Sequence, residues 1–371
     1  MRTWLRRLGT LLLFLLVGLC FAPSLIPPFL DRIYYEGPPT GHFDGERFFN
    51  PAPGPASAVH GGPARFLNRF IGSSERSRWP EQVPVRPTVP PRRVEGGDML
   101  VTWIGHATVL IQTQGLNILT DPIWSERASP FSFIGPRRAR APGVRFEDLP
   151  RIDLVLVSHN HYDHMDLPTL KRLWERDRPR IVTSLGNDSI LAREGIRATA
   201  LDWQQEDPIP CRAPDYTRTD MIYRPPCGAM LLRNHHWSSR WGTDRNRALW
   251  SAFIVRTPSA HIFFAGDTGF GDGSWADEAA RFGPFRLAIL PIGAYLPRDV
   301  MQANHMDPDE AVRVFEKLKP RMALGMHWGT FQLTFEAIGD PPRRLAEARK
   351  SRGIAEDRFV TTEVGRTFAV P

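Results

Sequence analysis

Residues 153–166 read DLVLVSHNHYDHMD, and this stretch decides the fold. Its first part, 153–157, is a short apolar run bounded by polar residues, which predicts a buried strand. The second part starts where the strand ends and follows the pattern His-x-His-x-Asp-His. Polar side chains that directly follow an apolar strand belong to a loop site of an α/β protein.

The histidines and the aspartate of this loop have the spacing of metal ligands. Alternate side chains on an extended segment point the same way, so His159 and His161 can bind one ion. Asp163 and His164 follow where the chain turns toward a helix, and they can face a second ion. Imidazole and carboxylate ligands suit Zn²⁺, with Fe²⁺ or Mn²⁺ as alternatives. A lone histidine is usually an ordinary surface or core residue, but this cluster favours a metal site.

Short strands and helices continue on both sides of the motif. Before it, apolar runs at 100–104, 108–113 and 116–119 predict strands joined by tight turns. Further strands are expected at 181–183, 230–233, 252–256, 261–265, 287–290 and 322–326. Helices are expected at 167–174, 188–193, 307–317 and 341–352. The helix at 307–317 opens with Asp-Pro-Asp-Glu, which supplies a cap, a proline in the first turn and acidic residues.

The N-terminus has the pattern of a membrane signal. Three arginines within the first seven residues precede an uncharged run over 8–30, whose most apolar part is 11–21. This pattern predicts a secretory signal or an N-terminal anchor, with the rest of the chain outside the cytoplasm. Cleavage signals around Cys20 are poor, so an uncleaved hydrophobic helix is favoured over a cleaved signal. The prediction is a membrane-anchored protein with its catalytic domain on the periplasmic side.

The chain of 371 residues divides into three expected parts. Residues 1–30 form the anchor or signal segment. Residues 31–97 form an arm rich in proline, glycine and arginine, because prolines at 38–39, 51–55 and 84–91 break regular elements. Residues 98–371 form one catalytic domain, against which the arm is expected to pack.

Composition narrows the classes of partner. Lysine and arginine number 47 against 40 acidic residues, a net charge of +7, which keeps nucleic acid or an anionic membrane surface open. Three cysteines are too few for a disulfide scaffold. Cys211 and Cys227 can pair outside the cytoplasm, although their spacing leaves this open.

Three further blocks complete a resemblance to the metallo-β-lactamase superfamily. His236 lies in NHHW, Asp267 in AGDT and His327 in GMHWG, each after an apolar strand. The resemblance implies an αββα sandwich, in which two mixed β-sheets are flanked by helices, and it implies two metal ions. One ion would be held by His159, His161 and His236, and the other by Asp163, His164 and His327, with Asp267 bridging them. His235 is an alternative to His236, which is preferred because it precedes Trp237.

Within this superfamily the chain resembles phospholipases D that hydrolyse N-acylphosphatidylethanolamine. The shared blocks are VTWIGHAT at 101–108, LTDPI at 119–123, SHNHYDHMD at 158–166, PIGAY at 291–295, HMDPDEAV at 305–312 and HWGTF at 327–331. A segment DGERFFNP at 44–51 also matches bacterial relatives. The resemblance implies hydrolysis of the phospholipid to N-acylethanolamine and phosphatidic acid.

The expected chemistry needs no serine or cysteine nucleophile. A hydroxide between two divalent ions attacks phosphorus, and Asp163 can hold or accept the water proton. The resemblance places a substrate-contacting histidine at His305, with a capping or packing role as the alternative. Asn304 is a further candidate for substrate contact, and Tyr295 is expected to line the mouth of the pocket. Asp121 is expected to orient a metal-binding histidine, with a plain Asp-Pro turn as the alternative.

Other functions stay open at this point. One is hydrolysis of a lactone, a β-lactam or a nucleic-acid phosphodiester by the same site. Another is a non-catalytic, metal-loaded envelope protein. The preferred partners are a phospholipid substrate and a membrane surface rather than nucleic acid, since no aromatic-basic RNA motif is present. A homodimer is possible.

Overall fold

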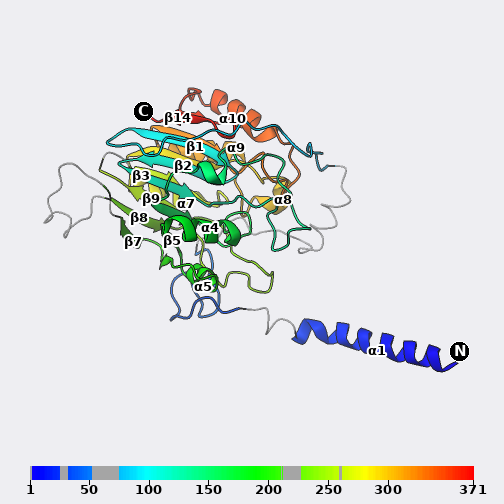
Figure 1. Ribbon diagram of the computed structural model, residues 1–371. Helices are drawn as coiled ribbons and strands as arrows, with labels where there is room; N and C mark the ends of the chain where they lie inside the picture. The colour runs from blue at the N-terminus through cyan, green and yellow to red at the C-terminus, as the bar shows by residue number, and fades with distance from the viewer. Residues whose placement is uncertain (1, 26–31, 52–74, 210, 212–226, 259–260) are drawn as a thin grey trace.

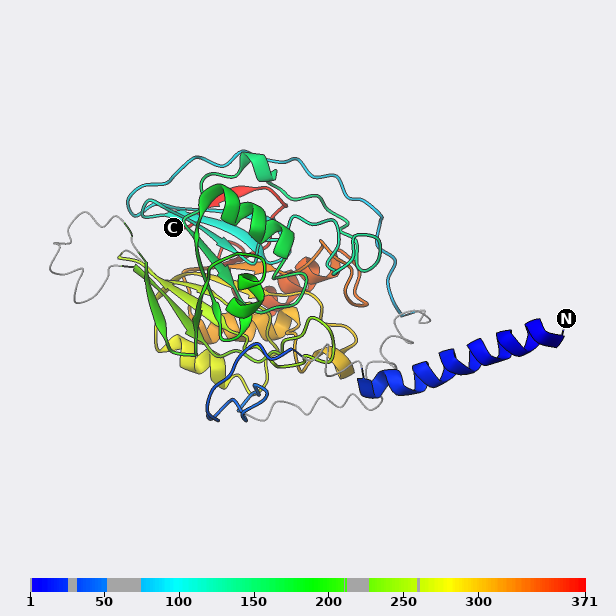
Figure 2. The same cartoon turned by 60° about the horizontal axis from the view of Figure 1, so that its bottom comes forward.

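The computed structural model describes residues 2–25, 32–51, 75–209, 211, 227–258 and 261–371. Within them, two seven-stranded mixed β-sheets lie face to face (Figures 1 and 2). The first sheet has the strand order β14 (Thr367–Ala369), β1 (Met99–Gly105), β2 (Thr108–Thr113), β3 (Leu116–Thr120), β4 (Leu154–Val157), β5 (Arg180–Ser184) and β6 (Thr199–Leu201). The second has the order β13 (Phe359–Val360), β12 (Met322–Met326), β11 (Phe285–Pro291), β10 (His261–Phe264), β9 (Ala252–Arg256), β8 (Cys227–Leu232) and β7 (Glu206–Ile209).

Each sheet is antiparallel on one side and parallel on the other. In the first sheet β14, β1, β2 and β3 pair antiparallel, while β3 to β6 run parallel. In the second sheet β7 to β10 pair antiparallel, while β10 to β13 run parallel. Because β4, β10 and β12 lie in the parallel parts of the sheets, the loops that follow them lie at the edge formed by the carboxyl ends of the strands. Sites in α/β folds form at this edge.

Three apolar cores hold the layers together. The largest lies between the sheets and includes side chains such as Trp103, Leu156 and Phe264. A second lies between the first sheet and the helices α4 (Leu167–Asp177) and α5 (Asn187–Ala192). A third packs α7 (Ser274–Ala280), α9 (Pro308–Leu318) and α10 (Asp340–Ser351) on the second sheet. The predicted architecture of two mixed sheets with helices is therefore confirmed.

Local sequence signals placed the long elements well. The predicted helix at 307–317 is α9, and Asp307 and Glu310 form a reciprocal capping box at its start. The described part also contains elements that the sequence analysis did not predict, namely β6, β7, β13, β14, α7, the four-residue α8 (Arg298–Met301) and the 3₁₀ turn η1 (Phe146–Asp148). The missed strands are two to four residues long. Their own sequence is too short to show a strand pattern, and they form because they pair with a neighbouring strand.

The N-terminal segment corrects one prediction. A helix, α1 (Arg2–Leu25), does form there. Within the described ranges, however, no helix combines the length and the apolar character required to cross a membrane. The predicted membrane anchor, and with it the membrane-anchored periplasmic location, is therefore wrong. A span needs about 20 consecutive apolar residues, and the strongly apolar part at 11–21 is only about half as long.

Cys211 and Cys227 form a disulfide. The pairing that the spacing left open is thus present, and it joins the start of β8 to the segment after β7. Of the arm at 31–97, residue 31 and residues 52–74 lie outside the described residues. Its entry, 32–51, packs Phe43 and Phe48 on Leu249 and Trp250 of the main domain.

Candidate metal centre

Four loops that follow strands meet at one place. The loop after β4 carries His159, His161, Asp163 and His164, and the loop after β8 carries His236; Asp267 and His327 follow β10 and β12. Asn234 ties two of these loops together, because its side-chain amide donates to the backbone oxygens of Ala265 and Asp267. All seven side chains that the sequence assigned to metals therefore lie in one region, where His161 is partly buried and the others are buried.

His159, His161 and His236 form a group that we call the histidine cluster. The Nε2 atom of His159 lies 2.8 Å from Nδ1 of His161, and Nε2 of His236 lies 3.4 Å from the same atom. These three nitrogens form one of the groups whose geometry suits a metal ion. His235, the alternative to His236, lies outside it, with Nδ1 2.8 Å from the backbone oxygen of Ala303.

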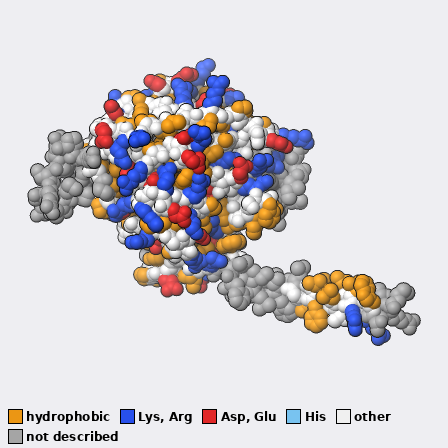
Figure 3. Space-filling view, in the orientation of Figure 1, with side chains coloured by type: hydrophobic (Ala, Val, Ile, Leu, Met, Phe, Trp, Pro, Cys, Tyr) orange, Lys and Arg blue, Asp and Glu red, His pale blue; other side chains and the backbone are white. Residues whose placement is uncertain are grey.

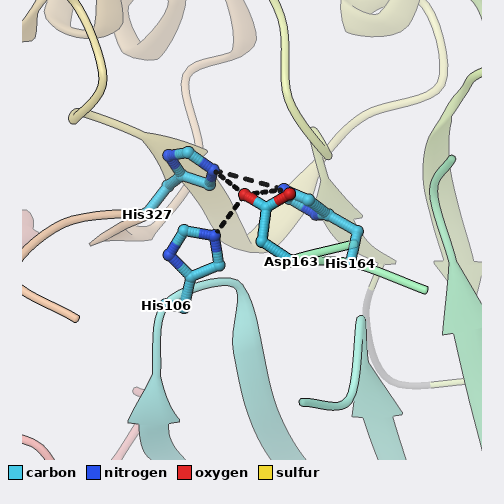
Figure 4. A group of neighbouring side chains, drawn as sticks. All are labelled: His106, Asp163, His164 and His327. Carbon is cyan, nitrogen blue, oxygen red and sulfur yellow. Dashed lines mark hydrogen bonds and ion pairs between the residues drawn. The ribbon is translucent and has the colours of Figure 1, made fainter. Parts of the chain in front are cut away.

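Asp163, His164 and His327 lie with His106 in a second group that could hold a metal ion (Figure 4), and we call the first three the aspartate cluster. The Nε2 atoms of His164 and His327 both lie 3.4 Å from Oδ2 of Asp163, and 3.2 Å from each other. All three side chains are buried. A compact set of two imidazoles and a carboxylate is a donor set that borderline divalent metals accept.

Asp267 lies between the two clusters. Its Oδ2 atom is 3.0 Å from His327 Nε2, 3.1 Å from His164 Nε2 and 3.9 Å from His236 Nε2. Its other oxygen, Oδ1, is buried without a hydrogen-bond partner among the described residues. A buried carboxylate oxygen without a partner is costly, and a bound cation would remove that cost.

Asp121 fixes which nitrogen of two histidines faces the centre. Its Oδ2 atom lies 2.6 Å from Nδ1 of His164, and it also accepts from the hydroxyl of Ser158 at 2.6 Å. Because that hydroxyl proton goes to Asp121, Ser158 Oγ accepts from Nδ1 of His159 at 2.8 Å. Both imidazoles thus keep a proton on Nδ1, so that Nε2 is the nitrogen that would bind a metal.

A backbone oxygen orients His236 of the histidine cluster in the same way. Nδ1 of His236 lies 3.0 Å from the backbone oxygen of Asn304, so its Nε2 is free to accept a metal. Asn304 contributes through this carbonyl. From the arm, Asn50 donates to the backbone oxygen of His236 at 2.9 Å and accepts from Trp250 Nε1 at 3.2 Å. The DGERFFNP segment thus stabilises the loop that carries His236.

The two clusters differ in their electrostatics. Burial lowers the pKa of His159 and His236 well below the usual range and that of His161 to about 3, so these imidazoles are neutral. Burial also acts on His164 and His327, but the carboxylates of Asp267 and Asp163 outweigh it. They raise the pKa of His327 to about 9 and that of His164 well above its usual value.

The acidic partners shift in the opposite direction. Burial alone would raise the pKa of Asp163 and Asp267, yet the adjacent His164 overrides it and keeps both pKa values well below the usual range. Without a metal, protons on His164 and His327 therefore balance the carboxylate charge. Divalent ions could take over this balancing role, so the residues present fit a metal pair.

The remaining predicted site residues lie at different depths. His305 is buried beside the centre, with Nδ1 3.9 Å from Oδ2 of Asp267, and burial lowers its pKa to about 4. Tyr295 was expected at the pocket mouth but is completely buried. Its hydroxyl is among the buried groups for which the described chain offers no hydrogen-bond partner.

His106 lies in the block VTWIGHAT and is not among the predicted metal ligands. Its Nε2 atom lies 2.8 Å from Oδ2 of Asp163, as Figure 4 shows, and its backbone oxygen accepts from the backbone N–H of His327 at 3.0 Å. One residue of the β1–β2 turn therefore contacts two members of the aspartate cluster. The signal in the sequence was a histidine directly after a buried strand, the same placement as the other ligands.

Comparisons with known proteins agree with this geometry. Residues 116–328 match a family described as "Beta-lactamase superfamily domain". The chain is 36% identical over 280 residues to N-acyl-phosphatidylethanolamine-hydrolyzing phospholipase D 1 of Caenorhabditis elegans, which covers 73% of this chain and 75% of that protein. It is 32% identical over 269 residues to the mitochondrial enzyme of the same name from Saccharomyces cerevisiae, covering 72% of this chain and 55% of that protein.

Solved structures share the fold. A metallo hydrolase from the archaeon Ignicoccus hospitalis aligns with a TM-score of 0.52 at 20% identity, covering 74% of this chain and 99% of that one. An isothiocyanate hydrolase from Delia radicum gut bacteria aligns with a TM-score of 0.54 at 19% identity, covering 73% and 99%. At these identities the likeness concerns the fold alone.

Proposed function

This chain belongs to the metallo-β-lactamase superfamily of metal-dependent hydrolases, and we propose that it is a dinuclear phosphodiesterase acting on N-acylphosphatidylethanolamine-type phospholipids. The products would be N-acylethanolamine and phosphatidic acid. The names of the two relatives given above describe enzymes that hydrolyse this lipid, and their matches cover most of this chain.

The observation that carries the proposal is the position of Asp267 between two donor clusters. Its Oδ2 atom lies 3.0–3.9 Å from nitrogens of both clusters. A carboxylate in that position can serve two ions at once. Two divalent ions about 3.5–4 Å apart are the arrangement that phosphodiester hydrolysis uses. We propose Zn²⁺ for both, since histidine and aspartate donors suit it.

The chain's own residues would divide the work as follows. When bound, the ions supply positive charge and a water of lowered pKa. Asp163, held at Oδ2 by His106, would accept the proton of the attacking water. The water oxygen would form the new bond to phosphorus, the bond from phosphorus to the ethanolamine oxygen would break, and the proton that Asp163 accepted would pass to that oxygen. His305, with its pKa near 4, is neutral at pH 7 and would donate a hydrogen bond to a phosphoryl oxygen.

A comparison of substrates and variants tests this proposal. The zinc-loaded protein is offered N-acylphosphatidylethanolamine, a generic phosphodiester, a lactone and a β-lactam, and metal is counted per chain. Two metals and turnover of the lipid are expected. Asp267→Asn should abolish turnover, whereas the exposed control Asp98→Asn should not change it.

The outcomes separate the alternatives. Turnover of another substrate with the lipid untouched would point to a hydrolase of a different bond. Two bound metals without any turnover would favour a non-catalytic role. One metal per chain in an active enzyme would overturn the dinuclear part alone.

A further inference from the structure

A loop near the metal centre exposes three large apolar side chains. Phe131, Phe133 and Ile134 are 48%, 76% and 58% exposed, and we call these three residues the apolar tip. Outside α1, no other stretch of the described chain exposes as many large apolar side chains in four residues. Single exposed apolar residues are ordinary, but a cluster marks an interaction site.

The loop is built to present these side chains. An antiparallel bridge between Arg127 and Arg137 closes its base. The guanidinium of Arg127 donates to the backbone oxygens of Ser132 at 3.1 Å and Gly135 at 2.6 Å. The two phenyl rings lie 5.6 Å apart, beside each other rather than in the core. Hydrogen bonds to the loop backbone therefore stabilise an exposed apolar surface.

A cavity of about 280 Å³ adjoins the tip. Ser129 and Pro130, which precede the tip, form part of its lining. Arg32, Arg193 and Arg240 line it as well. Three guanidinium groups around one small cavity next to an apolar loop give this surface a positive charge.

Two of these arginines are not neutralised by carboxylates. The Arg32 guanidinium lies 5.9 Å from the centre of the Trp241 ring, and that of Arg193 lies 5.6 Å from the Tyr34 ring. No carboxylate pairs with either guanidinium in the part of the chain that the structure describes. Trp241 is itself 40% exposed and lines the same cavity. The aromatic rings hold the guanidiniums in place without cancelling their charge.

The two carboxylates in the cavity lining have other partners. Glu194 lies 3.6 Å from the ammonium group of Lys171. Asp166 accepts hydrogen bonds from the hydroxyls of Ser125 and Thr169. Because three arginines line the cavity against these two carboxylates, the lining keeps a net positive charge. Figure 3 shows that lysine and arginine side chains, together with aspartate and glutamate, are spread over one face of the molecule.

Residues of this surface neighbour residues of the metal centre. Tyr162, which directly precedes Asp163, lines the cavity. On the other side, Arg138 follows the loop and pairs with Phe331, whose ring lies 5.3 Å from that of His106. The cavity thus reaches the residue before Asp163, and the loop that carries the apolar tip is linked to His106 through Arg138 and Phe331.

We propose that the apolar tip and the adjoining arginine-lined cavity dock on an anionic phospholipid bilayer. The apolar side chains would enter the acyl boundary, and Arg32 and Arg193 would face the lipid phosphates, the division of labour that interfacial protein segments use. The inference rests on the proposed function, since a lipid substrate must be reached at a bilayer surface. It adds which surface of this chain makes the contact.

A local fluorescent label tests the docking. In a Cys20→Ser background, Phe133→Cys carries an environment-sensitive dye, because Cys211 and Cys227 are already paired. The matched control is Arg197→Cys, an exposed position just before β6, at the opposite end of the first sheet from the metal loop. Phosphatidylglycerol vesicles should shift the emission of the dye at 133 to shorter wavelength and leave that at 197 unchanged. Phosphatidylcholine vesicles and added salt should weaken the shift.

Substitutions supply a second measurement. Arg32→Gln combined with Arg193→Gln should weaken the dye response to phosphatidylglycerol, by about fivefold in affinity for each arginine. Phe131→Ser with Ile134→Ser should weaken it as well, whereas Val89→Ser, at another exposed apolar residue, should not. An unchanged dye at 133, or equal shifts at 133 and 197, would overturn the proposal. A dye shift that requires the apolar tip but is equally large with phosphatidylcholine vesicles would also overturn it.

The two proposals fail in different ways. The dye shift requires no turnover, so docking without hydrolysis of N-acylphosphatidylethanolamine would leave the surface assignment intact and reject the proposed substrate. Hydrolysis of a monomeric short-chain substrate without any dye shift would do the reverse.

Discussion

The histidine cluster and the aspartate cluster are neighbours with opposite electrostatic character. Burial leaves His161 neutral, with a pKa of about 3, while carboxylates raise the pKa of His327 to about 9. The first cluster therefore offers neutral lone pairs and no charge. The second holds negative charge that protons balance when no metal is bound. The difference suggests that metal binding releases protons mainly from the aspartate cluster.

The largest effect is expected at the residue that both clusters share. Asp267→Ala removes a carboxylate whose Oδ2 atom lies 3.0–3.9 Å from nitrogens of both clusters, and it should lower kcat/KM by more than about a thousandfold, the equivalent of ~4 kcal/mol. Metal content per chain, measured on the same sample, should fall as well. A variant that keeps two metals and normal turnover would show that Asp267 does not bridge the metals.

Asp121 contacts a histidine of each cluster, directly or through Ser158, whereas Ser158 contacts only His159 of the histidine cluster among the described ligands. Asp121→Asn should weaken metal binding at both clusters by about 10–100-fold, because it disturbs His164 directly and His159 through Ser158. Ser158→Ala should affect the histidine cluster alone. Stepwise metal titrations of the two variants measure this. Equal losses at both metal sites in Ser158→Ala would contradict the chain of hydrogen bonds.

His106 acts on the aspartate cluster only. His106→Phe should reduce kcat by about tenfold or more, because Asp163 loses the hydrogen bond that holds its Oδ2 atom. His106→Gln keeps a donor at a similar reach and should restore part of the activity. The absorption spectrum of the Co²⁺-substituted protein would report the altered ligand geometry, and the two variants should bind the first metal equally well.

The metal-free protein should be most stable near pH 6.5. His161, with a folded-state pKa of about 3, contributes stability that is present above pH 6.5 and is lost as the pH falls toward 3. His327, with a pKa of about 9, contributes stability that is present below pH 6.5 and is lost as the pH rises through 9. Thermal unfolding of chelated protein should therefore show Tm falling by several degrees on both sides.

Zinc loading provides the control for that experiment. A metal on His327 replaces the proton, so the loss of Tm on the alkaline side should disappear. Tm values of loaded and chelated protein that follow the same curve between pH 6.5 and 9 would show that His327 does not bind the metal.

Local sequence signals were reliable where a residue's role depends on its immediate neighbours. The strand before Ser158 and the capping box at Asp307 depend on residues that are adjacent or one turn apart. The strands β6, β13 and β14 were missed, because two or three residues become a strand only when a neighbouring strand pairs with them. The N-terminal anchor was predicted from a local pattern whose apolar part is too short.

The sequence by itself determined the superfamily, the two-sheet architecture and the residues to consider as ligands, since each ligand follows an apolar strand. The family resemblance also implied how the ligands divide into two sets around Asp267. Only the tertiary structure decided that His106 and Asn50 support them. The physical reason is distance along the chain. His106 and Asp163 are 57 residues apart and Asn50 and His236 are 186 apart, yet hydrogen bonds join both pairs. No local pattern encodes contacts that form only when loops from different strands meet.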